Sequence, residues 1–219
     1  MESPHTICPV VALGDVFELA TAIESVPEEL SGALFVWVPS FDEKMVPLSA
    51  LKEFRRVVAS SAQDREVYNL YGGFFSILLA KSGLSGFNNG LGYSESRAWP
   101  TLDATGAAPA RYYVRRLHAY LPTATATALV EQDPKLRCKC AVCDGGRKLP
   151  IELDYHELKQ HFALARLWEL ELVQKRSVEE LQRKLRNDAN RIRSALGVLP
   201  RAFNIRVDHL NRWADALVE

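Results

Sequence analysis

The sequence predicts a mixed α/β fold, with parallel βα units in the first half of the chain and helices in the last third. Two observations carry this prediction. Short apolar runs, each closed by glycine or proline, alternate with helical patterns up to about residue 92. Beyond residue 153, apolar residues recur at spacings of three and four, which is typical of amphipathic helices.

Four βα units are expected in order along the first half. The strands are predicted at residues 7–13, 33–38, 67–71 and 87–91, and the helices between them at 16–23, 48–59 and 74–81. Near-continuous apolar strands are typical of a parallel sheet that is buried on both faces. Four units make half of an eightfold barrel, and the pattern alone fits an open four-stranded sheet equally well.

The middle of the chain is less regular. Residues 98–134 contain five prolines and glycines that interrupt any periodicity. Within them, residues 111–120 interleave arginines with aromatic residues. This run could contact phosphates and stack on bases, or it could pack its aromatic side chains and leave its arginines in solvent.

The C-terminal part is predicted to contain helices at residues 155–173 and 178–196, with Gly197 and Pro200 ending the second. We therefore divide the chain into residues 1–97, a parallel β/α half-barrel; residues 98–170, an irregular segment with a metal-binding subdomain; and residues 171–219, a basic helical extension.

Composition places the chain among soluble globular proteins. Its 219 residues are 47% hydrophobic and 25% charged, which argues against a disordered or fibrous protein. No apolar run approaches the roughly 20 residues that a membrane span requires. The first residues lack the pattern of a signal peptide, so a cytoplasmic protein without membrane association is expected.

Charge is unevenly distributed although 27 basic residues balance 27 acidic ones. Residues 1–50 hold eight acids against Lys44 alone, whereas residues 175–212 hold ten bases against four acids. The basic end permits an anionic partner such as tRNA or DNA, and Arg183, Arg186 and Arg193 are its candidate phosphate contacts. A solvated outer helix face is the alternative interpretation.

The most specific motif is Cys-Lys-Cys-Ala-Val-Cys, which places Cys138, Cys140 and Cys143 within six residues. Three soft thiolates need one further ligand to form a tetrahedral site, and zinc fits such a donor set. His156 and His161 are the candidates for the fourth ligand. They are five residues apart, about 140° around a helix, so only one of them can face the metal.

A closed Cys3His site would be structural rather than catalytic, because it leaves no coordination position for a substrate. Clustering of the three cysteines also argues against a disulfide framework. The remaining cysteine, Cys8, lies in an apolar run and is expected to be a small core residue.

From about residue 67 to residue 170, the chain resembles the tRNA-guanine transglycosylase family, which includes the queuine and archaeosine tRNA-ribosyltransferases. The family carries a Cys-x-Cys-x-x-Cys…His zinc site after the last strand of a (β/α)8 barrel. The three cysteines match that motif. The context of the family's histidine favours His161 over His156. Residues 90–97 resemble the branch associated with 7-deazaguanine insertion into DNA.

The resemblance fails at the catalytic residue. The family's aspartate nucleophile falls at Asn88, and a neutral amide is a poor nucleophile. If the chain is an enzyme, the resemblance implies a pentosyltransferase with a substitute carboxylate. Glu95 is the best candidate, with Asp103 behind it and Arg97 as a phosphate contact. An ordinary salt bridge between Glu95 and Arg97 is the simpler alternative.

Only about four strands precede the zinc motif, so the other half of a barrel is missing from this chain. A half-barrel would expose strand edges and apolar faces, and we therefore expect a homo- or hetero-oligomer whose partner completes the barrel. The chain is predicted to be a zinc-binding, nucleophile-lacking accessory subunit of a base-exchange system that acts on tRNA or DNA. An active enzyme and a fragment of a split transglycosylase are the alternatives.

Overall fold

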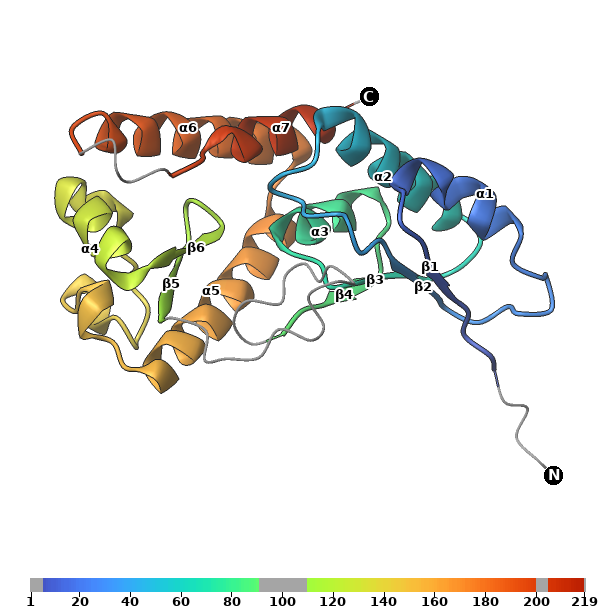
Figure 1. Cartoon of the computed structure of the whole chain (residues 1–219), viewed down its shortest axis with the longest axis horizontal. Coiled ribbons are helices and arrows are strands. Elements are labelled where there is room, and N and C mark those ends of the chain that lie inside the picture. The colour runs from blue at the N-terminus through green and yellow to red at the C-terminus, as the bar shows by residue number, and fades with distance from the viewer. Residues whose placement is uncertain (1–5, 91–109, 200–204, 219) are drawn as a thin grey trace. The chain divides into compact units, whose positions relative to one another are not determined.

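The computed structural model describes residues 6–90, 110–199 and 205–218. The described chain forms two compact units (Figure 1). The first contains residues 6–90 and 215–218, and the second contains residues 110–199 and 205–214. Glu95, Arg97 and Asp103 lie outside the described residues.

A parallel sheet forms the first unit. Its strands are β1 (Val10–Ala12), β2 (Leu34–Trp37), β3 (Val67–Leu70) and β4 (Gly86–Asn88), and among the described residues they are ordered β1-β2-β3-β4. Every neighbouring pair is parallel. The predicted mixed α/β class with four parallel strands is confirmed. This order is common to a segment of a (β/α)8 barrel and to an open sheet wound in one direction.

The helical segments of this unit are η1 (Val16–Glu18), α1 (Leu19–Glu24), α2 (Leu48–Ser61), α3 (Phe74–Leu78) and η2 (Leu79–Ser82). Helices α1 and α2 pack side by side (Figure 1). The apolar face of α2 is buried, and its Phe54 packs against Phe41 with ring centroids 4.9 Å apart. Burial of this face stabilises the helix more than its intrinsic propensity does.

The two faces of the sheet differ in burial. Along β2 and β3, fully buried residues such as Leu34 and Val67 alternate with half-buried ones. On the half-buried face the rings of Phe35 and Tyr68 stack with centroids 5.2 Å apart, and Val10 of β1 is exposed. The expectation of a sheet buried on both faces therefore holds for one face only in the described part of the chain.

Polar side chains fix the ends of β3 and β4. The backbone of Tyr71, which follows β3, has a φ of 62°, in the left-handed region. The Tyr71 amide donates to Oδ1 of Asn88 at 2.7 Å, and the Gly72 amide donates to the Asn88 carbonyl at 2.9 Å. Asn88 thus joins the end of its own strand to the turn that follows the neighbouring strand.

The second unit combines a hairpin with helices. Strands β5 (Arg111–Val114) and β6 (Ala119–Pro122) are antiparallel. The helical segments are α4 (Thr123–Gln132), η4 (Pro134–Leu136), η5 (Asp144–Gly146), η6 (Pro150–Glu152), α5 (Tyr155–Lys175), α6 (Val178–Leu196) and α7 (Asp208–Ala216), whose last two residues belong to the first unit. The hairpin and α4 occupy part of the segment that was predicted to be irregular.

Capping residues set where the two long helices begin. Asp154 and Glu157 form a capping box at the start of α5, and Ser177 and Glu180 form one at the start of α6. Such reciprocal bonds satisfy amides that have no partner within the helix. None of the described helices has both the length and the apolar character needed to cross a bilayer.

Candidate metal centre

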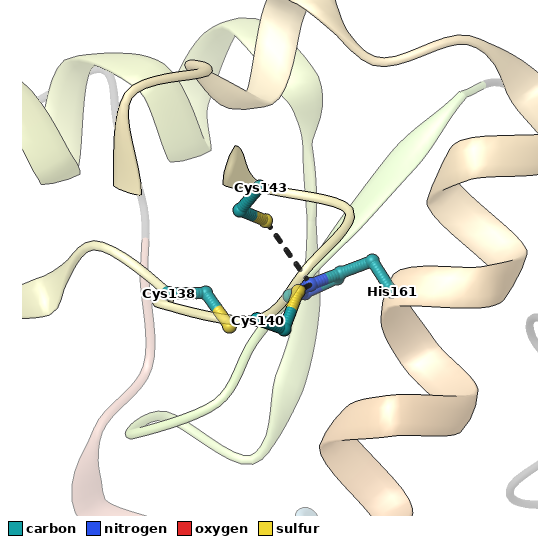
Figure 2. A group of neighbouring side chains, drawn as sticks. All are labelled: Cys138, Cys140, Cys143 and His161. Carbon is teal, nitrogen blue, oxygen red and sulfur yellow. Dashed lines mark hydrogen bonds between the residues drawn. The ribbon is translucent and has the colours of Figure 1, made fainter. Parts of the chain in front are cut away.

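Four side chains of the second unit converge on one point (Figure 2). Cys138, Cys140 and Cys143 come from the loop between η4 and η5, and His161 comes from the second turn of α5. One ligand atom from each residue lies within 4.8 Å of the others. His161 Nδ1 is 3.5 Å from the Cys140 Sγ and 3.4 Å from the Cys143 Sγ. This arrangement could hold a metal ion.

Backbone hydrogen bonds and left-handed residues fold the cysteine loop. Asp144, Gly145 and Gly146 have φ values of 48°, 64° and 98°, which reverse the chain directly after the third cysteine. Two glycines suit this turn because they adopt positive φ without steric cost. The Gly146 amide donates to the Cys143 carbonyl at 2.8 Å, and the Gly145 amide donates to the Cys140 carbonyl at 3.3 Å.

A hydrogen bond to β5 orients the histidine. His161 Nε2 is 2.8 Å from the Tyr113 carbonyl oxygen, so Nε2 carries the proton and donates it. With the proton on Nε2, the lone pair of Nδ1 would be available to a metal ion bound among the three sulfurs. A carbonyl that holds the far nitrogen is a common support for metal-binding histidines. The local geometry therefore prepares His161 as a ligand through Nδ1.

Tyr112 contacts two of the four candidate ligands. Its ring stacks on His161 with centroids 4.2 Å apart and an interplanar angle of 13°. Its hydroxyl oxygen is 3.5 Å from the Cys143 Sγ. Burial, followed by the neighbouring Cys143, raises the pKa of Tyr112 well above its ordinary value, so the hydroxyl stays protonated.

The four candidate ligands also perturb one another's protonation. Hydrogen bonding to Cys138 and Cys143 lowers the pKa of Cys140, and hydrogen bonding to Cys138 raises the pKa of Cys143. Burial lowers the pKa of His161, but hydrogen bonds to Cys138 and Cys140 outweigh it and raise the pKa to about 9. In the metal-free cluster, protons therefore take the place that a cation would fill, and metal binding has to release them.

The two candidate histidines are placed differently. His161 is buried in the cluster, whereas His156 is exposed on α5 and packs edge-on against the Tyr155 ring. The structure thus brings together the four residues Cys138, Cys140, Cys143 and His161 and leaves His156 outside. Cys8 is exposed, so its expected role as a core residue is wrong.

Residues 111–120 follow the packing alternative for their tyrosines, but Arg115 and Arg116 contact other side chains and are not left in solvent. Tyr112 and Tyr113 are buried and face the unit's own core. Arg115 lies over the Trp168 ring at 4.0 Å, and Arg116 forms a 2.6 Å ion pair with the buried Asp188. These aromatic side chains are not available to stack on bases.

The other predicted contacts are separate from the metal cluster. Arg183, Arg186 and Arg193 are exposed on α6, and Arg193 pairs with Asp208 at 3.0 Å. Asn88 is exposed at the end of β4 in the first unit.

The sequence analysis did not predict a buried ionic network that joins α5 to the β5–β6 hairpin. Glu169 accepts hydrogen bonds from the Tyr113 hydroxyl at 2.8 Å and from Arg166 at 2.6 Å, and its carboxylate also contacts His118 Nδ1. Glu169 and His118 are fully buried. The spacing of Arg166 and Glu169, three residues apart on one helix, was the available signal.

Comparison with protein-family models, curated proteins and solved structures finds no match to the chain.

Proposed function

We propose that the Cys3His cluster is a structural zinc centre that ties α5 to the cysteine loop and to the β5–β6 hairpin. The convergence of four ligand atoms from two separate elements within 4.8 Å carries this proposal. Four protein ligands complete a tetrahedron and leave no position open for a substrate or an activated water. The centre would therefore contribute to folding.

The donor set favours zinc over harder ions. Magnesium and calcium prefer oxygen ligands, whereas this site offers three sulfurs and one imidazole nitrogen. Cys138, Cys143 and His161 are buried, so solvent has little access to a bound ion on that side. Iron also accepts thiolate ligands, and metal analysis distinguishes it from zinc.

Metal content of two histidine variants tests the proposal. The purified chain should hold about one zinc ion, as for other tetrahedral thiolate sites. His161→Ala should lose most of that zinc. His156→Ala is the matched control, because it removes an exposed imidazole from the same helix, and it should keep the zinc. Loss of zinc in His156→Ala alone, or its absence from the wild type, would contradict the proposal.

For the chain as a whole, we propose a nucleophile-lacking accessory role in a base-exchange system that acts on tRNA or DNA. Support comes from the resemblance of the cysteine motif to that of the transglycosylases and from the hydrogen bond that the Asn88 side chain makes. The Asn88 side-chain oxygen accepts a hydrogen bond from the Tyr71 amide at 2.7 Å, which is a structural use of that side chain. An accessory subunit needs the zinc module but no nucleophile.

Exchange assays separate this role from an active enzyme. The chain alone should not exchange labelled guanine or a deazaguanine into tRNA or DNA, because a covalent intermediate needs an anionic nucleophile. Robust exchange that is abolished by Glu95→Gln would instead support the active enzyme. Exchange that appears only with a partner protein and survives Glu95→Gln would support the accessory role.

Partner dependence is part of the same proposal. The half-buried face of β2 and β3 and the exposed Val10 of β1 leave apolar surface that a completing partner would cover. Light scattering should therefore report a mass above that of a 24.5 kDa monomer. A soluble, well-folded monomer at all concentrations would count against it.

The exposed arginines of α6 are the proposed contact for nucleic acid. Neutralising Arg183, Arg186 and Arg193 together should weaken binding and reduce its dependence on salt, because each phosphate contact releases counterions. Arg147→Gln is a suitable control, since Arg147 is an exposed arginine of the same unit that pairs with Asp144. Equal losses in both variants would argue against a specific role for α6.

A further inference from the structure

The three sulfurs of the metal centre differ in their access to solvent. Cys138 is 4% exposed and Cys143 is 1% exposed, whereas Cys140 is only half-buried. A reagent from solvent therefore meets the Sγ of Cys140 before the other two. Site-selective chemistry at cysteines follows thiolate character and exposure together.

A hydrogen bond also makes the sulfur of Cys143 chemically different from that of Cys140. The Tyr112 hydroxyl is 3.5 Å from the Cys143 Sγ, and Tyr112 is itself buried. When Cys143 is a metal-bound thiolate it has no proton, so the tyrosine hydroxyl has to be the donor. Donation to the sulfur withdraws electron density and lowers its nucleophilicity. The stacked contact with His161 holds the tyrosine ring in place for this bond.

We infer that Cys140 is a modification site, the sulfur at which peroxides and other soft electrophiles attack the metal centre, and that Tyr112 protects Cys143. The inference rests on the zinc centre proposed above. In the peroxide reaction, the Cys140 thiolate attacks one oxygen of hydrogen peroxide. An S–O bond forms and the O–O bond breaks, which gives a sulfenic acid at Cys140 and releases hydroxide.

Loss of this thiolate weakens the centre. Metal ligation uses the deprotonated sulfur, and a sulfenic acid has lost the charge that made it a ligand. Three donors then remain for an ion that prefers four. Oxidation at one accessible atom thereby couples to release of the ion and to loosening of the link between the cysteine loop and α5.

The experiment uses the zinc-loaded full chain with Cys8→Ser, because Cys8 is exposed and would react independently of the centre. Zinc content is measured first. The protein is then treated with hydrogen peroxide below one equivalent, sulfenic acids are trapped with dimedone, and peptide mapping locates them. A chromophoric chelator follows zinc release in parallel. We expect about tenfold more adduct on Cys140 than on Cys138 or Cys143, with zinc released at the same rate.

Two tyrosine variants test the protecting role. Tyr112→Phe keeps the ring and removes the hydroxyl, so adducts on Cys143 should increase severalfold while zinc still binds. Tyr155→Phe is the matched control, since it removes an exposed hydroxyl near the start of α5, and it should leave the distribution unchanged.

The outcomes separate the two proposals. A chain that binds no zinc overturns the metal centre and this inference together. A zinc-bound chain whose first adduct lies on Cys138 or Cys143 overturns the assignment of Cys140 alone. The wild-type distribution decides that point without any tyrosine variant, so it does not depend on how well Tyr112→Phe folds.

Discussion

Replacing the buried Glu169 by alanine should destabilise the second unit strongly. The carboxylate accepts hydrogen bonds from Arg166 and Tyr113 and contacts His118, and no part of its side chain is exposed. Tyr113 also supplies the carbonyl that holds His161. The substitution therefore removes the charge at the centre of the network that supports α5, the helix that carries His161.

The burial of Arg166 determines how much unfolding free energy Glu169→Ala should lose. The Arg166 side chain is only 9% exposed, so water cannot replace the carboxylate that offsets its charge. Breaking a buried pair by removing one partner costs about 3–5 kcal/mol of unfolding free energy. Glu169→Gln keeps the size and one acceptor oxygen, and we expect it to lose about 1–3 kcal/mol.

Glu171→Ala is the matched control on the same helix. Its side chain is 64% exposed and pairs with Lys175, which is 72% exposed, so its loss should cost no more than about 0.5 kcal/mol. Urea unfolding of the three variants with zinc present, followed by helical circular dichroism, gives the comparison. If Glu169→Ala lies within about 1 kcal/mol of Glu171→Ala, the network does not stabilise the unit and this reasoning is wrong.

Three further predictions concern the metal, pH and the first unit. Chelating zinc should increase hydrogen exchange in residues 138–148 while α6 stays protected, because the four candidate ligands lie in the cysteine loop and on α5 and none lies on α6. Burial lowers the pKa of His118. Burial alone would raise the pKa of Glu169, but the positive charge of Arg166 lowers it below its ordinary value. Urea titrations should therefore show unfolding free energy falling as pH drops below about 6.5, with a flatter slope in His118→Gln. Glu43→Gln should lose about 1–3 kcal/mol in urea unfolding, since this buried carboxylate accepts from the Gly73, Phe75 and Ser76 amides, while the exposed Glu29→Gln should change little.

Periodicity predicted the elements whose burial follows one face. The expected helix at residues 178–196 coincides with α6, because its apolar stripe and its capping box both lie within the local sequence. The four strands were predicted from a different local signal, short apolar runs that glycine or proline closes. Periodicity did not predict the strands within residues 111–122. Each strand has four residues, and the turn between them contains His118 at a φ of 52°, so the segment is too short to show a repeating pattern. Tertiary packing of Tyr113 against Phe162 decides their structure.

The candidate site was predictable where its residues are close in sequence. The spacing of the three cysteines is a local signal that suggests a metal cluster without any knowledge of the fold. The choice between His156 and His161 is different, because both lie on one helix and either could face the loop. It is decided by the Tyr113 carbonyl, which is 48 residues away in sequence and bonds only His161 in the described structure. Residue spacing left both histidines open, and in the sequence only the resemblance of the segment around His161 to the family's histidine favoured it.

Asn88 falls where the resemblance would place an aspartate nucleophile, and its side chain has a structural use in the first unit. An aspartate nucleophile has to keep one oxygen free for attack on the ribose carbon. The Asn88 oxygen instead accepts from the Tyr71 amide, and the Asn88 carbonyl accepts from the adjacent Gly72. Tyr71 lies in the left-handed region, which costs a non-glycine residue energy unless the surroundings hold it. The amide thus stabilises a strained turn between two strands, and this use explains the residue without catalysis.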